Sequence, residues 1–122
     1  MNRIDRILVP TALDTGSAHA LRRALLLAGP TAATVEVLYV ISPAAEVMRS
    51  HLTSGKAGVR DQMRAQEKLE AWVAQHAPDL AVDTRVAEGE IVRQIVKASA
   101  RAEIVVLCSA GRNEPGDWVF GT

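Results

Sequence analysis

Residues 104–112 read Ile-Val-Val-Leu-Cys-Ser-Ala-Gly-Arg, an apolar run followed directly by a loop of small residues. A run that is apolar at every position is typical of a strand buried on both faces of a parallel sheet. Residues 7–9, Ile-Leu-Val, form a similar run near the N-terminus, and Pro10 follows them. We therefore expect these two strands to be neighbours at the centre of one sheet.

The segments between these two strands alternate between helical and strand patterns. Helices are expected at 18–28, 59–76 and 90–100, and strands at 34–41 and 81–86. Gly29-Pro30 is expected to stop the first helix and Pro78 the second. The alternation of polar and apolar residues at 81–86 predicts a strand at the edge of the sheet.

This order of elements predicts an α/β fold, with an open parallel sheet of four strands and helices on both faces. Residues 44–58 fit neither pattern, and the segment from Cys108 to the end is expected to be a loop. The fourth strand would then lack an outer neighbour, and an unpaired apolar edge favours association with a partner chain.

The composition excludes several classes of protein. The 122 residues predict one domain, spanning 1–122, and the 14 basic residues balance the 14 acidic ones. A neutral chain with 3% aromatic residues lacks the basic footprint and the stacking surface of nucleic-acid-binding proteins. No run approaches the roughly 20 apolar residues of a membrane helix, and one cysteine excludes an internal disulfide. We expect a cytoplasmic protein with neither nucleic acid nor membrane as a partner.

Ligands of such sheets bind beyond the carboxyl ends of the strands, where the winding direction reverses. The turn after the first strand, 10–14, and the loop after the fourth, 108–116, both lie there. Gly111 and Gly121 can present backbone N–H groups to an anion, and Thr122 adds a hydroxyl. Asp14 can bind a ligand hydroxyl or cap the following helix, and capping is the commoner role.

Residues typical of catalysis do not form a recognisable set. His19, His51 and His76 lack the spacing of metal ligands. Cys108 has no neighbouring base or cation in the sequence that would favour a thiolate, which predicts a buried, inert thiol. Glu88 and Glu90 flank Gly89 in what we expect to be a solvated turn. We do not expect an enzyme.

Five stretches together resemble universal stress protein domains in their order and spacing: 7–11, 16–24, 37–41, 86–95 and 104–112. The resemblance covers nearly the whole chain. It implies an open parallel α/β sheet, a homodimer and, in nucleotide-binding members, a site for ATP or another adenine nucleotide. The resemblance implies contacts to that nucleotide from Pro10 and Thr11 after the first strand and from the backbone of Val40.

In such members the phosphate loop reads Gly, two residues, Gly, nine residues, then Gly with Ser or Thr. Gly111, nine residues and Gly121-Thr122 match this pattern, whereas Cys108 stands at the first glycine. Arg112 is the cation that offsets the acidic residues of this loop. Ala12 stands where an aspartate commonly contacts the nucleotide.

These departures imply weakened nucleotide binding. A hydrogen bond to a charged group contributes about 1.5–3 kcal/mol, which corresponds to roughly tenfold to hundredfold in affinity. Family members also continue into a further helix and a fifth strand, so the resemblance implies an unusual or truncated ending. Two functions stay open: a regulator or sensor that binds an adenine nucleotide weakly, and a member without nucleotide that acts through homodimeric or other protein contacts.

Overall fold

The computed structural model describes residues 4–41, 58–78, 81–108 and 117–121. Its elements, in chain order, are β1 (Arg6–Thr11), α1 (Thr15–Thr31), β2 (Thr34–Ile41), α3 (Gly58–His76), β3 (Asp83–Glu88), α4 (Ile91–Ser99), β4 (Ile104–Cys108) and β5 (Asp117–Gly121). The strands form one sheet in the order β3-β2-β1-β4-β5.

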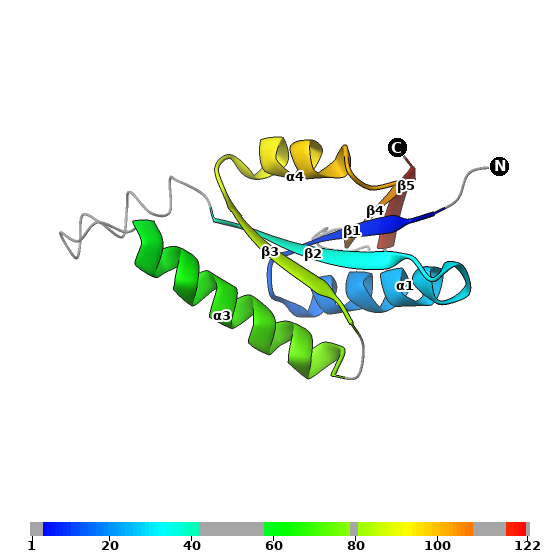
Figure 1. Ribbon diagram of the computed structural model, residues 1–122, viewed down its shortest axis with the longest axis horizontal. Helices are drawn as coiled ribbons and strands as arrows, with labels where there is room; N and C mark the ends of the chain where they lie inside the picture. Colours follow the sequence, from blue (N-terminus) through cyan, green and yellow to red (C-terminus); the bar gives the residue numbers. More distant parts are fainter. Residues whose placement is uncertain (1–3, 42–57, 79–80, 109–116, 122) are drawn as a thin grey trace.

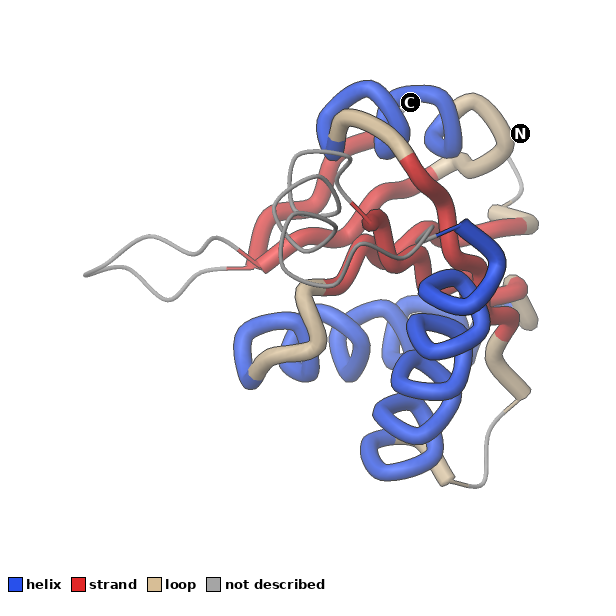
Figure 2. Tube along the Cα trace, turned by 90° about the vertical axis from the view of Figure 1, so that its left-hand side faces the viewer, coloured by secondary structure: helices blue, strands red, loops and turns tan. Residues whose placement is uncertain are grey.

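The first four strands run parallel, with β1 between β2 and β4 and with β3 at the edge. Figure 1 shows α1 and α3 on one face of the sheet and α4 on the other, and the turned view in Figure 2 shows the same three layers. The predicted α/β fold, with an open parallel sheet and helices on both faces, is confirmed. Residues 42–57, which include most of the segment that fitted neither pattern, lie outside the described residues.

The two faces of the sheet have separate cores, because successive residues of a strand point to opposite faces. Ile7 and Val9 pack with α1 and α3, whereas Leu8, between them in sequence, packs under α4; all three are fully buried. The predicted apolar stripe of α3 lies in the first core through Leu69, Trp72 and Val73. The core under α4 is smaller: it joins Leu8 to Leu38, Ala98, Ala102 and Val105.

Helix α1 is longer at both ends than its sequence pattern predicts. The expected stop at Gly29-Pro30 is wrong, since the helix runs through Pro30 to Thr31 and ends at Ala32, which has a φ of 57°. A proline this late in a helix removes a single hydrogen bond of the last turn. The Thr31 hydroxyl donates to the carbonyl oxygens of Ala28 (3.2 Å) and Leu27 (3.4 Å) in the last turn.

The segment expected to be a loop after β4 contains a further strand. Residues Asp117–Gly121 pair antiparallel with β4, so that Cys108 lies opposite Asp117 and Ile104 opposite Gly121. The expectation that β4 lacks an outer neighbour is therefore wrong. The glycines suggested a loop, but Trp118, Val119 and Phe120 between them are residue types that favour strands.

None of the helices in the described ranges combines the length and the hydropathy needed to cross a bilayer.

Candidate functional site

A cavity of about 230 Å³ lies at the carboxyl ends of β1, β2 and β4, between the sheet and α4. We call it the main cavity. From β1 the chain continues to β2 and β3 on one side, whereas β4 lies on the other side of β1, so the strand order reverses between β1 and β4. Its lining residues are Pro10, Thr11, Ala12, Asp14, Gly16, Ser17, Leu38, Val40, Ile91, Ile95, Leu107 and Cys108.

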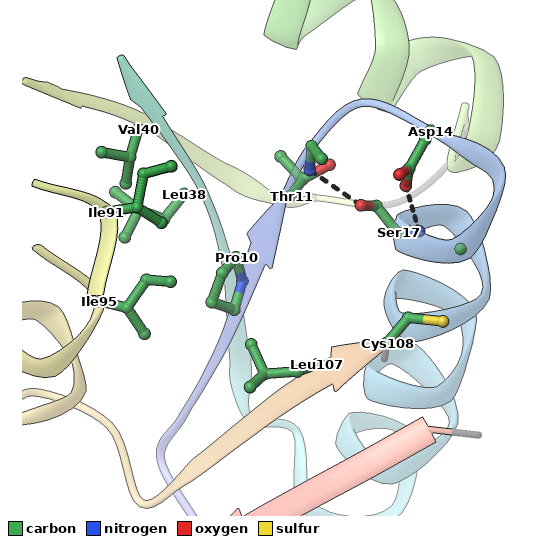
Figure 3. A pocket seen from close by; sticks show the side chains of 12 residues that line it. Pro10, Thr11, Asp14, Ser17, Leu38, Val40, Ile91, Ile95, Leu107 and Cys108 are labelled. Carbon is green, nitrogen blue, oxygen red and sulfur yellow. Dashed lines mark hydrogen bonds between the residues drawn. The ribbon is translucent and has the colours of Figure 1, made fainter. Parts of the chain in front are cut away.

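The turn between β1 and α1 forms the polar side of the main cavity (Figure 3). The N–H of Ala12 donates to Ser17 Oγ at 2.9 Å, and the N–H of Leu13 donates to Thr11 Oγ1 at 2.9 Å. Asp14 is the N-cap of α1 and its Oδ1 accepts the N–H of Ser17 at 2.8 Å. The capping interpretation of Asp14 is confirmed, while its carboxylate also borders the cavity.

These bonds determine what the turn can offer a ligand. Hydrogen bonds from the Ser17 hydroxyl and the Ser17 N–H hold the pKa of Asp14 below its ordinary value, so the carboxylate is ionised at neutral pH. The N–H groups of Ala12, Leu13 and Ser17 are already paired within the turn. What it presents to the cavity is an anionic acceptor at Asp14 and the hydroxyl of Thr11, which suit ligand hydroxyls better than a phosphate.

Leu13 adopts a left-handed conformation, with a φ of 60°. Such a conformation is uncommon for a branched side chain, and it persists only where the surroundings determine it. Here the Leu13 N–H bonds to Thr11 Oγ1, and the Leu13 side chain packs against the core between the sheet, α1 and α3. The polar side of the main cavity is thus held in one conformation.

The opposite side of the main cavity is apolar and comes from both the sheet and α4. Pro10, Leu38, Val40 and Leu107 belong to the strands. Ile91 and Ile95 face them from α4, as Figure 3 shows. The four-residue spacing of Ile91 and Ile95 places them one turn apart on the same side of the helix. The cavity therefore has one polar and one apolar side.

Glu90 positions α4 over the sheet. Its carboxylate accepts the N–H groups of Val92 (3.2 Å) and Arg93 (2.9 Å), which makes it the N-cap of the helix. Just before it, Gly89 has a φ of 148°, and a side chain there would lie 2.5 Å from Gln94 Nε2. The pair Glu88 and Glu90, expected to form a solvated turn, thus includes the residue that starts α4.

Cys108 ends β4 at the rim of the main cavity and is partly buried. A Cβ atom placed on Gly16 would lie 3.0 Å from Cys108 Sγ, so the thiol packs directly on the first turn of α1. The sequence predicted a buried thiol, and the structure instead places Cys108 where a ligand can contact it.

The structure brings some of the predicted site residues together and separates another from them. Pro10, Thr11 and Val40 all line the main cavity. Gly111, Arg112 and Thr122 lie outside the described residues. Gly121 lies opposite Ile104, at the start of β4. With a rise of about 3.3 Å per residue, this position is about 13 Å along the strand from Cys108, so Gly121 does not border the cavity.

Sequence reasoning missed Ser17 and the apolar residues of α4 as parts of the site. Ser17 was one of several small residues near a helix start, and nothing in its spacing indicated that it bonds back to Ala12. Ile91 and Ile95 gave a helical signal only. Among the described residues no group of three His, Cys, Asp or Glu side chains is placed to hold a metal ion.

Comparison with known proteins decides the family. The model of the universal stress protein family matches residues 3–122. The chain belongs to the universal stress protein family. A search of curated protein sequences found no significant match.

Solved structures of this universal stress protein's relatives share its fold at low sequence identity. The universal stress protein UspA from Lactobacillus plantarum is 24% identical, with a TM-score of 0.59 over 94% of this chain and 83% of that one. The hypothetical protein MJ0577 is 20% identical, with a TM-score of 0.65 over 93% of this chain and 80% of that one. A universal stress protein solved in complex with cAMP is 17% identical, with a TM-score of 0.53 over 85% and 72%.

Proposed function

We propose that this universal stress protein is a regulator or sensor that binds an adenine nucleotide weakly in the main cavity. The observation that carries the proposal is the division of the cavity into two sides. An apolar slot formed by Val40, Leu38 and Ile95 suits a flat aromatic base, and the polar side at Thr11 and Asp14 suits sugar hydroxyls. A relative of the same fold was solved with cAMP.

The size of the main cavity limits how much of a nucleotide it encloses. At about 230 Å³ it falls below the roughly 300–1,000 Å³ of sites that enclose a whole drug-sized ligand. We therefore infer that the base and part of the sugar enter, while the phosphates extend outward. Because the turn presents the Asp14 carboxylate and the N–H groups of Ala12 and Leu13 are paired within it, we assign the phosphates to Gly111 and Arg112, which follow Cys108 in the sequence.

Calorimetric titration with ATP and with cAMP, each with and without magnesium, tests this function. We expect saturable binding in the high micromolar to millimolar range, since Ala12 offers no carboxylate to the ligand. The variant Val40→Trp fills the slot and should abolish the heat. The matched control is Leu26→Trp, which adds the same ring at an α1 position that is 70% exposed and remote from the cavity. An unchanged affinity in Val40→Trp, or absence of heat at millimolar ligand in the wild type, would refute the proposal.

The second candidate, a homodimer or another protein contact without nucleotide, is favoured by the outer side of α4. Val92 and Val96, which lie one turn apart on α4 and do not line the main cavity, are 63% and 62% exposed, so two apolar side chains of this short helix face solvent. Adjacent exposed apolar residues of this kind are typical of interaction surfaces. Sedimentation equilibrium should show a dimer that Val96→Asp dissociates. A monomer at all concentrations would exclude the dimer.

A further inference from the structure

A second cavity, of about 60 Å³, lies on the same face of the sheet as the main cavity but beside β3. We call it the basic cavity. Its lining residues are Leu38, Arg85, Ala87, Gln94, Lys97, Ala98 and Arg101. Leu38 borders both cavities, while α4 contributes different residues to each: Ile91 and Ile95 to the main cavity, Gln94, Lys97 and Ala98 to this one.

Three cationic side chains reach the basic cavity from different elements. Arg85 belongs to β3, Lys97 to the last turn of α4, and Arg101 to the turn that follows α4. Leu38, Ala87 and Ala98 form an apolar floor between them. The Gln94 side chain adds an amide, and it packs against Gly89. The cavity thus combines donors and cations with a surface that excludes water.

A buried carboxylate pairs with both arginines of the basic cavity. Glu36 on β2 is 4% exposed, and its side chain is ion-paired to three guanidinium groups. The shortest nitrogen–oxygen distances are 3.0 Å to Arg6, 3.3 Å to Arg101 and 3.8 Å to Arg85. Glu36 is not among the residues that line the basic cavity, so a ligand there would meet the arginines rather than this carboxylate.

The positive charge of this region exceeds what its carboxylates neutralise. Asp83, 3.5 Å from Arg6, and Glu103, which accepts the N–H of Arg6 at 2.9 Å, are the other carboxylates of the cluster. With Lys97 included, four cations face three carboxylates. Lys97 makes no ion pair with any other described residue. The half-exposed guanidinium groups of Arg85 and Arg101, 50% and 42% exposed, keep N–H groups on the solvent side for a further acceptor.

We propose that the basic cavity binds a single phosphate group, either as inorganic phosphate or as the terminal group of a small phosphorylated molecule. Guanidinium groups recognise tetrahedral oxyanions through paired N–H donors, and the lysine adds a point charge. A volume of about 60 Å³ admits a group of this size and excludes a base or a sugar. Because α4 lies between the two cavities, an anion bound here would contact the helix that closes the main cavity.

The proposal is tested by NMR titration of the full chain with potassium phosphate and, separately, with glycerol 3-phosphate, at constant ionic strength maintained with potassium chloride. We expect saturable shifts of the Ala87, Gln94 and Ala98 amides. The variant Lys97→Gln should weaken binding about fivefold, the upper range for one exposed charge. Its matched control is Arg93→Gln, which removes the same charge from an exposed position on α4 that does not line the cavity.

Shifts at these amides with either ligand, reduced in Lys97→Gln and retained in Arg93→Gln, would support the phosphate site. Binding of glycerol 3-phosphate without inorganic phosphate would assign the site to phosphorylated molecules, and the reverse to the free ion. Shifts that chloride reproduces, that Arg93→Gln weakens equally, or that occur only around Thr11 and Cys108 would overturn the proposal. Because the two cavities are read through different amides, this result is independent of nucleotide binding.

Discussion

Replacing Glu36 with glutamine removes the negative charge that three arginines share, while it preserves the shape of the side chain. The Glu36 side chain is 5% exposed, whereas those of Arg6, Arg101 and Arg85 are 33%, 42% and 50% exposed. Breaking a fully buried ion pair costs about 3–5 kcal/mol. Here the partly exposed guanidinium groups regain water, and the glutamine oxygen still accepts one bond. We therefore expect the free energy of unfolding to decrease by about 2 kcal/mol, which is less than for a fully buried ion pair.

Thermal unfolding followed by circular dichroism measures this loss. For a domain of this size, about 2 kcal/mol corresponds to a decrease in Tm of roughly 5–10 °C. The matched control is Glu70→Gln on α3, whose carboxylate is exposed and bonded to Gln66 at 2.8 Å; it should change the stability by less than about 0.5 kcal/mol. A Tm of Glu36→Gln within 2 °C of the wild type would refute the role assigned to this buried carboxylate.

Two further predictions concern the turn after β1. Asp14→Ala removes the N-cap of α1 and should cost about 0.5–2 kcal/mol at pH 7. Because the folded pKa of Asp14 is lowered, its contribution is present above the unfolded value and is lost as the pH falls through the folded pKa. The difference between variant and wild type in urea unfolding should thus shrink below about pH 4, and a difference that persists at pH 2 would contradict it. Ala12→Asp places a carboxylate at an exposed position that lines the main cavity. By calorimetry it should tighten ATP binding about tenfold to hundredfold, and an unchanged affinity would refute the comparison with nucleotide-binding relatives.

The parallel sheet was predictable from sequence because its two central strands are apolar at every position. Ile7, Leu8 and Val9 must be covered on both faces, and in a chain of alternating strands and helices the helices provide this cover. The edge position of β3 followed from its alternating polarity in the same way. The sequence pattern was less informative at the ends of elements, since α1 continues through Pro30 and ends only at Ala32, which adopts a left-handed conformation.

The candidate site could be predicted only in part. Its place beyond the strands, with Pro10, Thr11 and Val40, followed from the topology and from the resemblance to the family. Its apolar side requires α4 to lie over the sheet, which no spacing within the helix reveals. Gly121 was predicted wrongly. Its spacing from Gly111 indicated a phosphate loop, but in the structure Gly121 ends β5, a strand that pairs with β4. Long-range strand pairing of this kind is not encoded in short motifs.

The most direct test of the account is a titration of the methyl-labelled protein with ATP and with cAMP, observed by NMR. We expect saturable shifts concentrated at the methyl groups of Val40, Ile91, Ile95 and Leu107, which line the apolar side of the main cavity. Methyl groups of the core under α1 and α3, such as those of Val35 and Leu69, should remain unchanged. No shift at millimolar nucleotide, or saturable shifts that leave these four residues unaffected, would contradict it.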